Sequence, residues 1–257
     1  MSKMFQRISL VLALLLALTG TVAFTSPATV ARAQDAETLS YGDTVTGEIT
    51  EDTSEVVYTF EGAEDDLVIV QVIPIENEDG DTLDVKAVMS DPDDEQLIDT
   101  TEDYAKQLTY TYGTAFMEVL GGDGTYTITI SADEEGSTGE FEIQLVQPEE
   151  LELDAPVTIE GSVQGYYRYL GFYTVKAEED VTLLLTVAEG SGLSLIIEEY
   201  DGDYLSRRAY GDGVAAKAMG FYMSPSDAGY YIVSVSSPSY LFEETDFSAT
   251  LQASAGN

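Results

Sequence analysis

The sequence predicts an all-β protein with two tandem β-sandwich domains, jelly-roll-like in character, after a cleaved signal peptide. Three observations predict this fold class. Short runs rich in Val, Ile, Thr, Tyr and Phe alternate with glycine or acidic turns. No amphipathic stretch of ordinary helix length interrupts them after the first part of the chain. The order of strands and turns then occurs a second time, which indicates a duplicated domain.

The first 33 residues are typical of a secretory signal peptide. Lys3 and Arg7 supply positive charge before an apolar run from Ile8 to Leu18, and Ala31-Arg32-Ala33 has the small-residue pattern of a cleavage site. The apolar run is short for a membrane anchor, which is the alternative interpretation. We therefore expect residues 1–33 to be removed, and the mature protein to be secreted and to contact no membrane.

The first domain is predicted to span residues 36–147. Its expected strands are Thr44–Ile49, Glu55–Phe60, Leu67–Ile75, Leu83–Met89, Gln107–Tyr112, Ala115–Leu120, Gly124–Ser131 and Gly139–Val146. The run Leu67–Ile75 is almost continuously apolar, so we expect it to be a central strand.

The second domain is predicted to span residues 155–252, after a proline-bracketed acidic boundary at Gln147–Pro156. Gly229–Val235 repeats the pattern of Gly124–Ile130, in which a glycine opens an alternating strand. Alternation places Tyr126 and Tyr231 on the inward face of these two strands, where we expect each hydroxyl to hydrogen-bond near the strand start, as in a tyrosine corner.

Charge and composition exclude several functions. The chain has 48 acidic and 10 basic residues, a formal net charge of -38, and no cysteine or histidine. Such a surface repels nucleic acid and attracts cations and basic partners. Without cysteine or histidine there can be no disulfide, cysteine nucleophile, Ser-His-Asp triad or histidine-bound zinc.

Four short motifs recur in the same order in both halves. The first half has Gly47-Glu48-Ile49, Tyr58-Thr59-Phe60, Asp91-Pro92-Asp93 and Gly124-Thr125-Tyr126; the second has Gly161-Ser162-Val163, Tyr173-Thr174-Val175, Asp201-Gly202-Asp203 and Gly229-Tyr230-Tyr231. This order resembles the bacterial pre-peptidase C-terminal (PPC) domain. The resemblance implies β-sandwich modules of exported proteins, some of them similar to collagen-binding or calcium-binding modules. No peptidase accompanies the modules in this chain.

Aspartates in the turns are the candidate metal ligands. Carboxylate oxygens suit Ca²⁺, which takes six to eight oxygen ligands. The candidates are Asp91, Asp93 and Asp94 in the first half, and Asp201 and Asp203 in the second. The alternative interpretation is that aspartate simply favours turns.

Together these observations predict a secreted, non-catalytic protein with a binding or structural role outside the cell. Its partner would be an extracellular protein or polysaccharide. The second half has eleven tyrosines, a residue type suited to binding either. The alternative interpretation is that these tyrosines pack inside the sandwich, as expected for Tyr231. Two alternatives stay open: an accessory subunit of a separately encoded secreted peptidase, and a hydrolase that uses a pair of carboxylates.

Overall fold

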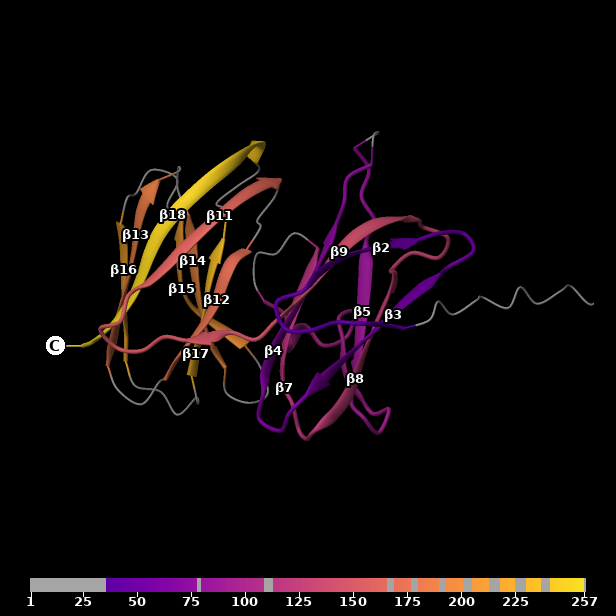
Figure 1. The fold of residues 1–257 in the computed structure, drawn as a ribbon, viewed down its shortest axis with the longest axis horizontal. Helices are drawn as coiled ribbons and strands as arrows, with labels where there is room; N and C mark the ends of the chain where they lie inside the picture. The colour runs from indigo at the N-terminus through magenta and orange to yellow at the C-terminus, as the bar shows by residue number, and fades with distance from the viewer. Residues whose placement is uncertain are drawn as a thin grey trace, which may run out of the picture. The chain divides into compact units, whose positions relative to one another are not determined.

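The computed structural model describes residues 36–77, 80–108, 113–165, 169–176, 180–189, 193–200, 205–212, 218–224, 230–236 and 241–256. The predicted signal peptide lies outside these residues. The described chain is all-β, with four sheets that form two sandwiches (Figure 1). Its one short helix, η1, is a single 3-10 turn at Tyr104–Lys106.

The first sandwich contains nine strands. They are β1 (Glu37–Thr38), β2 (Thr44–Ile49), β3 (Glu55–Gly62), β4 (Leu67–Pro74), β5 (Val85–Ser90), β6 (Gln96–Asp99), β7 (Thr114–Val119), β8 (Gly124–Ala132) and β9 (Gly139–Val146). The sequence did not predict β1 or β6, which have only two and four residues. Of the predicted strand Gln107–Tyr112, residues 109–112 lie outside the described part, and Gln107 forms only an isolated bridge with Phe116.

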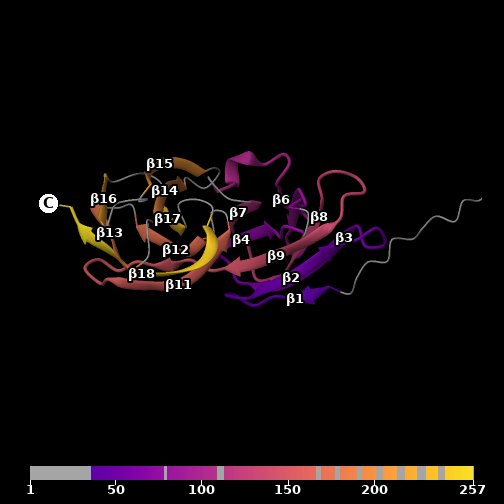
Figure 2. The same ribbon diagram turned by 90° about the horizontal axis from the view of Figure 1, so that it is seen from above.

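The described residues of the second sandwich also form nine strands. They are β10 (Glu149–Glu150), β11 (Val157–Gly165), β12 (Tyr169–Lys176), β13 (Val181–Glu189), β14 (Ser194–Tyr200), β15 (Leu205–Asp212), β16 (Ala218–Met223), β17 (Tyr230–Ser236) and β18 (Leu241–Ala255). Figure 2 shows β11 beside the long β18, with which it pairs in antiparallel register. These strands extend beyond the range 155–252 at both ends, and the domain boundaries stay a prediction.

The two sandwiches have the same strand order. In the first, the sheets are β1-β3-β8-β5-β6 and β2-β9-β4-β7; in the second they are β10-β12-β17-β14-β15 and β11-β18-β13-β16. Each strand of the second sandwich has the place of the strand of the first sandwich whose number is nine lower. Even the parallel pairing of the opening two-residue strand is repeated, as β1 with β3 and β10 with β12. The predicted duplication is therefore confirmed in the strand order.

Alternating apolar residues build the core of each sandwich. Val56, Tyr58 and Phe60 on β3 face the same buried cluster as Val68 and Val70 on β4. In the second sandwich the core includes Leu183 and Leu185 of β13, with Val233 and Val235 of β17. Strand β4 lies between β9 and β7, so the predicted central position of Leu67–Ile75 is confirmed.

Candidate binding site

The four motifs of the first half meet in two close contacts. A β-carbon on Gly47 would lie 2.4 Å from both the Tyr58 hydroxyl and a ring atom of Phe141, so only glycine leaves room there. Gly124 has a φ of +149°, and a β-carbon on it would lie 2.7 Å from Pro92. The glycines thus let the first motif pack on the second, and the third on the fourth.

Both tyrosines are buried as predicted, but only the Tyr126 hydroxyl bonds near the start of its own strand, whereas that of Tyr231 bonds to the residue after β16. Tyr126 is 1% exposed and its hydroxyl donates a 2.8 Å hydrogen bond to the carbonyl oxygen of Gly122. Tyr231 is 4% exposed and donates a 2.6 Å bond to the carbonyl oxygen of Ser224. In each sandwich a buried phenol therefore ties a core strand to the turn or strand end before it.

The predicted metal ligands of the first half lie in the turn between β5 and β6. One Asp91 carboxylate oxygen accepts hydrogen bonds from the backbone amides of Asp93, at 2.9 Å, and Glu95, at 2.8 Å. Asp94 adopts a left-handed φ of 63°. These contacts are the turn chemistry of aspartate. Within the described ranges, no group of three or more acidic residues could hold a metal ion.

Asp201 and Asp203 lie outside the described residues. The structure therefore brings Asp91, Asp93 and Asp94 into one turn and leaves the second-half pair without a description. Calcium binding at either place stays a prediction.

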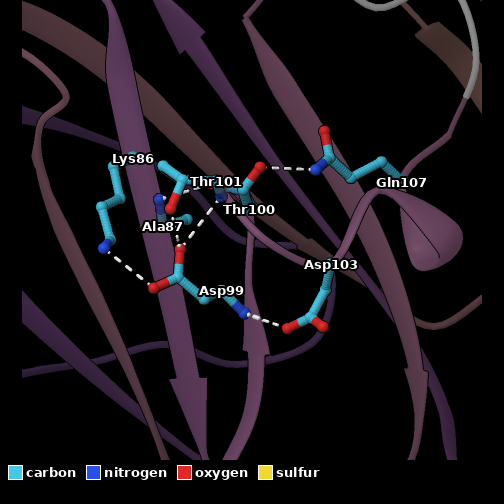
Figure 3. A network of polar contacts seen from close by, with 7 residues as sticks. All are labelled: Lys86, Ala87, Asp99, Thr100, Thr101, Asp103 and Gln107. Atoms are coloured by element: carbon cyan, nitrogen blue, oxygen red, sulfur yellow. Dashed lines mark hydrogen bonds and ion pairs between the residues drawn. The ribbon is translucent and has the colours of Figure 1, made fainter.

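A different group of residues forms an ordered polar centre at the end of β6 (Figure 3). Asp99 Oδ2 lies 2.8 Å from Lys86 Nζ. Its other oxygen, Oδ1, accepts hydrogen bonds from the Thr101 hydroxyl, at 2.7 Å, and the Thr101 amide, at 3.0 Å. The Asp99 amide in turn donates to Asp103 Oδ2 at 2.7 Å. Side chains on both sides of the turn therefore hold its backbone.

The same turn is fixed to β5 and to the chain that follows it. Thr100 exchanges two 3.0 Å hydrogen bonds with Ala87, one through its amide and one through its hydroxyl oxygen. Gln107 Nε2 donates a 2.6 Å bond to the Thr100 carbonyl oxygen. We call residues 99–108 the pinned turn.

Lys106 and Glu118 attach the far end of the pinned turn to β7. Lys106 Nζ donates to Glu118 Oε2, and the Glu118 side chain is only 8% exposed. Because β6 belongs to one sheet and β7 to the other, this ion pair and the Asp99 network together fix the connection between the two layers.

The pKa values of Asp99 and Glu118 are shifted in opposite directions. Burial opposes the ionisation of Asp99, but the hydrogen bonds and charge supplied by Lys86 and Thr101 outweigh it and hold the pKa of Asp99 below its ordinary value. Burial raises the pKa of Glu118, and the contact with Lys106 only partly offsets that effect. The surroundings of Asp99 thus favour its charged form, whereas burial makes the charged form of Glu118 more costly and the contact with Lys106 offsets part of that cost.

Tyr104 projects from the pinned turn and is 73% exposed. It is the most exposed large hydrophobic side chain among the described residues, ahead of Tyr222 on β16 at 59%. Since the backbone beneath Tyr104 is held on both sides, little conformational entropy of the turn would be lost on binding. This combination makes the pinned turn the candidate binding site.

Sequence reasoning did not find this site. The segment Asp99-Thr100-Thr101-Glu102-Asp103 carries a signal for it, because Asp and Thr at such spacing commonly bond to nearby backbone amides. The pairing of Lys86 with Asp99 could not be read without the register of β5 and β6.

Comparison with solved structures gives the expected resemblance. The chain matches the pre-peptidase C-terminal domain of a collagenase from Bacillus anthracis. The match covers 44% of this chain and 97% of that domain, with 17% identity and a TM-score of 0.33.

Longer matches cover both sandwiches. A putative secreted protein from Eubacterium rectale matches over 81% of this chain and 73% of its own length, with 14% identity and a TM-score of 0.27. The CBM22-1-CBM22-2 tandem domain of Paenibacillus barcinonensis Xyn10C matches over 84% of this chain and 92% of its own length, with 8% identity and a TM-score of 0.23.

No family profile and no curated protein matches the sequence. A search of the described residues for helices found none with the length and apolar character needed to cross a membrane.

Proposed function

We propose that this chain is a secreted, non-catalytic binding protein that recognises an extracellular protein or polysaccharide through the pinned turn. The observation that supports the proposal is the exposed ring of Tyr104 on a backbone held by side chains from β5, β6 and β7. Tyrosine offers a flat apolar surface and a polar tip, which suits both stacking on a sugar and packing against a protein.

The leader and the composition are consistent with this role. Residues 1–33 have the pattern of a signal peptide, and a chain without cysteine gains no stability from oxidation after export. The ion pairs of the pinned turn provide contacts between elements that a disulfide could provide in other exported domains.

The test is a binding array of glycans and matrix proteins, probed with the chain lacking residues 1–33. We expect Tyr104→Ala to weaken binding of the array ligand by about tenfold or more, as for a central aromatic contact. Its thermal midpoint should not change, because the ring is mostly exposed.

Tyr222→Ala is the matched control, since it removes another exposed tyrosine from the chain. Equal loss of binding in both variants would contradict the proposed site, and so would full binding by Tyr104→Ala. If no glycan or matrix protein on the array binds the parent chain, the proposed function itself fails.

A further inference from the structure

A second surface of the first sandwich has a feature that its fold does not explain. Glu48 on β2 and Glu140 on β9 are direct partners in the antiparallel register. Such partners have β-carbons about 4.5–5.5 Å apart, and like charges placed directly opposite each other destabilise a sheet. Both side chains are exposed, and neither takes part in the pinned turn.

These two glutamates line a hollow of about 420 Å³. Its accessible apolar part is formed by Ile75, which is half-buried, whereas Ile49 and Leu83 border the hollow but are buried in the core. Three more carboxylates, of Glu51, Glu76 and Asp81, complete the acidic part of the lining. The residues described around the hollow include no lysine or arginine.

We propose that this hollow binds a lysine or arginine side chain of a partner polypeptide. Both side chains combine an aliphatic stem with a cationic head, and they bury the stem against apolar surface while the head stays in a polar environment. Here the stem packs on Ile75, whose amide donates a 2.9 Å hydrogen bond to the Glu140 carbonyl oxygen and which therefore lies beside Glu140, and the head lies between Glu48 and Glu140. A cation at that place relieves the repulsion between the two facing carboxylates.

The net charge of -38 favours the approach of a cationic partner. The same charge attracts any cationic peptide to the whole surface, so the experiment has to suppress this unspecific binding. The proposal rests on the hollow and the facing glutamates, so it does not depend on the role of Tyr104.

The probes are fluorescent hexapeptides of lysine, of arginine and of 2,3-diaminopropionic acid, whose ammonium group has almost no stem. Binding is measured by fluorescence anisotropy in 1 M NaCl, where the Debye length of about 3 Å suppresses long-range attraction. We expect saturable binding of the lysine or arginine peptide at a one-to-one ratio. The peptide of 2,3-diaminopropionic acid should bind at least about tenfold more weakly, because it cannot reach the apolar floor.

Two kinds of variant distinguish binding in the hollow from attraction to the negatively charged surface as a whole. The double variant Glu48→Gln/Glu140→Gln should weaken binding by about tenfold or more, since it removes both facing charges. Thr138→Phe should weaken binding as well, because it fills the rim of the hollow without changing the charge. The control Glu134→Gln/Glu135→Gln removes two exposed charges from the turn between β8 and β9 and should bind like the parent.

Three results would overturn the proposal: equal weakening by the control, equal binding of the short-stemmed peptide, or no saturable binding at this salt concentration. A melt of each variant shows whether it is folded. The control and Thr138→Phe keep the test informative if the double glutamine variant does not fold.

Discussion

The Tyr126 hydroxyl donates its hydrogen bond to the carbonyl oxygen of Gly122, four residues earlier in the chain. The ring of Tyr126 also stacks on Phe60 of β3, with centroids 5.4 Å apart. One side chain therefore fixes both the turn that opens β8 and the packing of β8 on its neighbour. Tyr231 makes the corresponding bond to Ser224 in the second sandwich.

Removing the Tyr126 hydroxyl should destabilise the first sandwich modestly. Tyr126→Phe leaves the partly buried Gly122 carbonyl without this donor and should cost about 1 kcal/mol of unfolding free energy. Removing the ring of the equivalent residue, in Tyr231→Ala, should cost about 3 kcal/mol or more because it leaves a cavity. Urea denaturation measures both. Tyr104→Phe is the control, since it removes a hydroxyl from an exposed side chain. If Tyr104→Phe and Tyr126→Phe lower the unfolding free energy equally, the hydrogen bond of Tyr126 to Gly122 contributes nothing.

Adding one methyl group at Gly47 should destabilise the first sandwich. In Gly47→Ala the new β-carbon would overlap Phe141 and the Tyr58 hydroxyl, so these rings must shift at a cost of about 1–3 kcal/mol. Gly121→Ala is the matched control, because a β-carbon there meets nothing within 4 Å. Gly121→Ala should keep or slightly raise the urea midpoint, because alanine lowers the entropy of the unfolded chain. Midpoints that fall equally for the two variants would show that the contacts with Phe141 and Tyr58 do not decide the outcome.

The opposite pKa shifts of Asp99 and Glu118 predict opposite slopes of stability with pH. The pKa of Asp99 is lowered from 3.8 in the folded chain, so its contribution is present above that pH and is lost as the pH falls through the folded-state value. The pKa of Glu118 is raised from 4.5, so the folded state holds its proton more tightly. The stability that this group contributes therefore decreases as the pH rises from 4.5 through the folded-state value.

Urea melts across this pH range test each group separately. Asp99→Asn should flatten the loss of stability on the acid side, whereas Glu118→Gln should flatten the decrease above pH 4.5. If either variant keeps the slope of the parent protein, the assignment of that slope to its carboxylate is wrong.

Calcium binding by the β5–β6 turn has its own signature in a thermal melt. Monovalent salt should raise the midpoint gradually as the Debye length falls from about 30 to about 3 Å, because it screens a strongly negative chain. A calcium site would add a saturable rise at constant, high NaCl. Asp91→Asn or Asp93→Asn should reduce that rise. A midpoint that follows ionic strength alone would remove Asp91, Asp93 and Asp94 from consideration as ligands.

Alternation of side chains explains how much of the fold could be predicted. The inward positions of Tyr126 and Tyr231 follow from period-two burial, which needs no knowledge of partner strands. The short strand β6 has no such pattern, because Gln96–Asp99 is too short for alternation to be visible. It forms a strand through its pairing with β5.

The candidate binding site was harder to predict for a related reason. Glu118 lies in a predicted strand, but Lys106, with which it forms an ion pair, comes from a different segment. Nothing in the local sequence of either residue indicates that contact. The turn aspartates, by contrast, were visible in the sequence, and their bonds to backbone amides are local interactions.

The shared strand order has a consequence for how the chain folds. Every strand pair in the described residues joins two strands of the same sandwich. The first sandwich is complete once Val146 has emerged from the ribosome, because its last strand is β9. It can therefore fold while the second half is still in transit, as domains commonly do during synthesis. Because the two sandwiches have the same strand order, a strand of one could pair in the place of its equivalent in the other and give a misfolded chain. Folding β1–β9 first prevents this exchange, since those strands are already paired when β10–β18 appear.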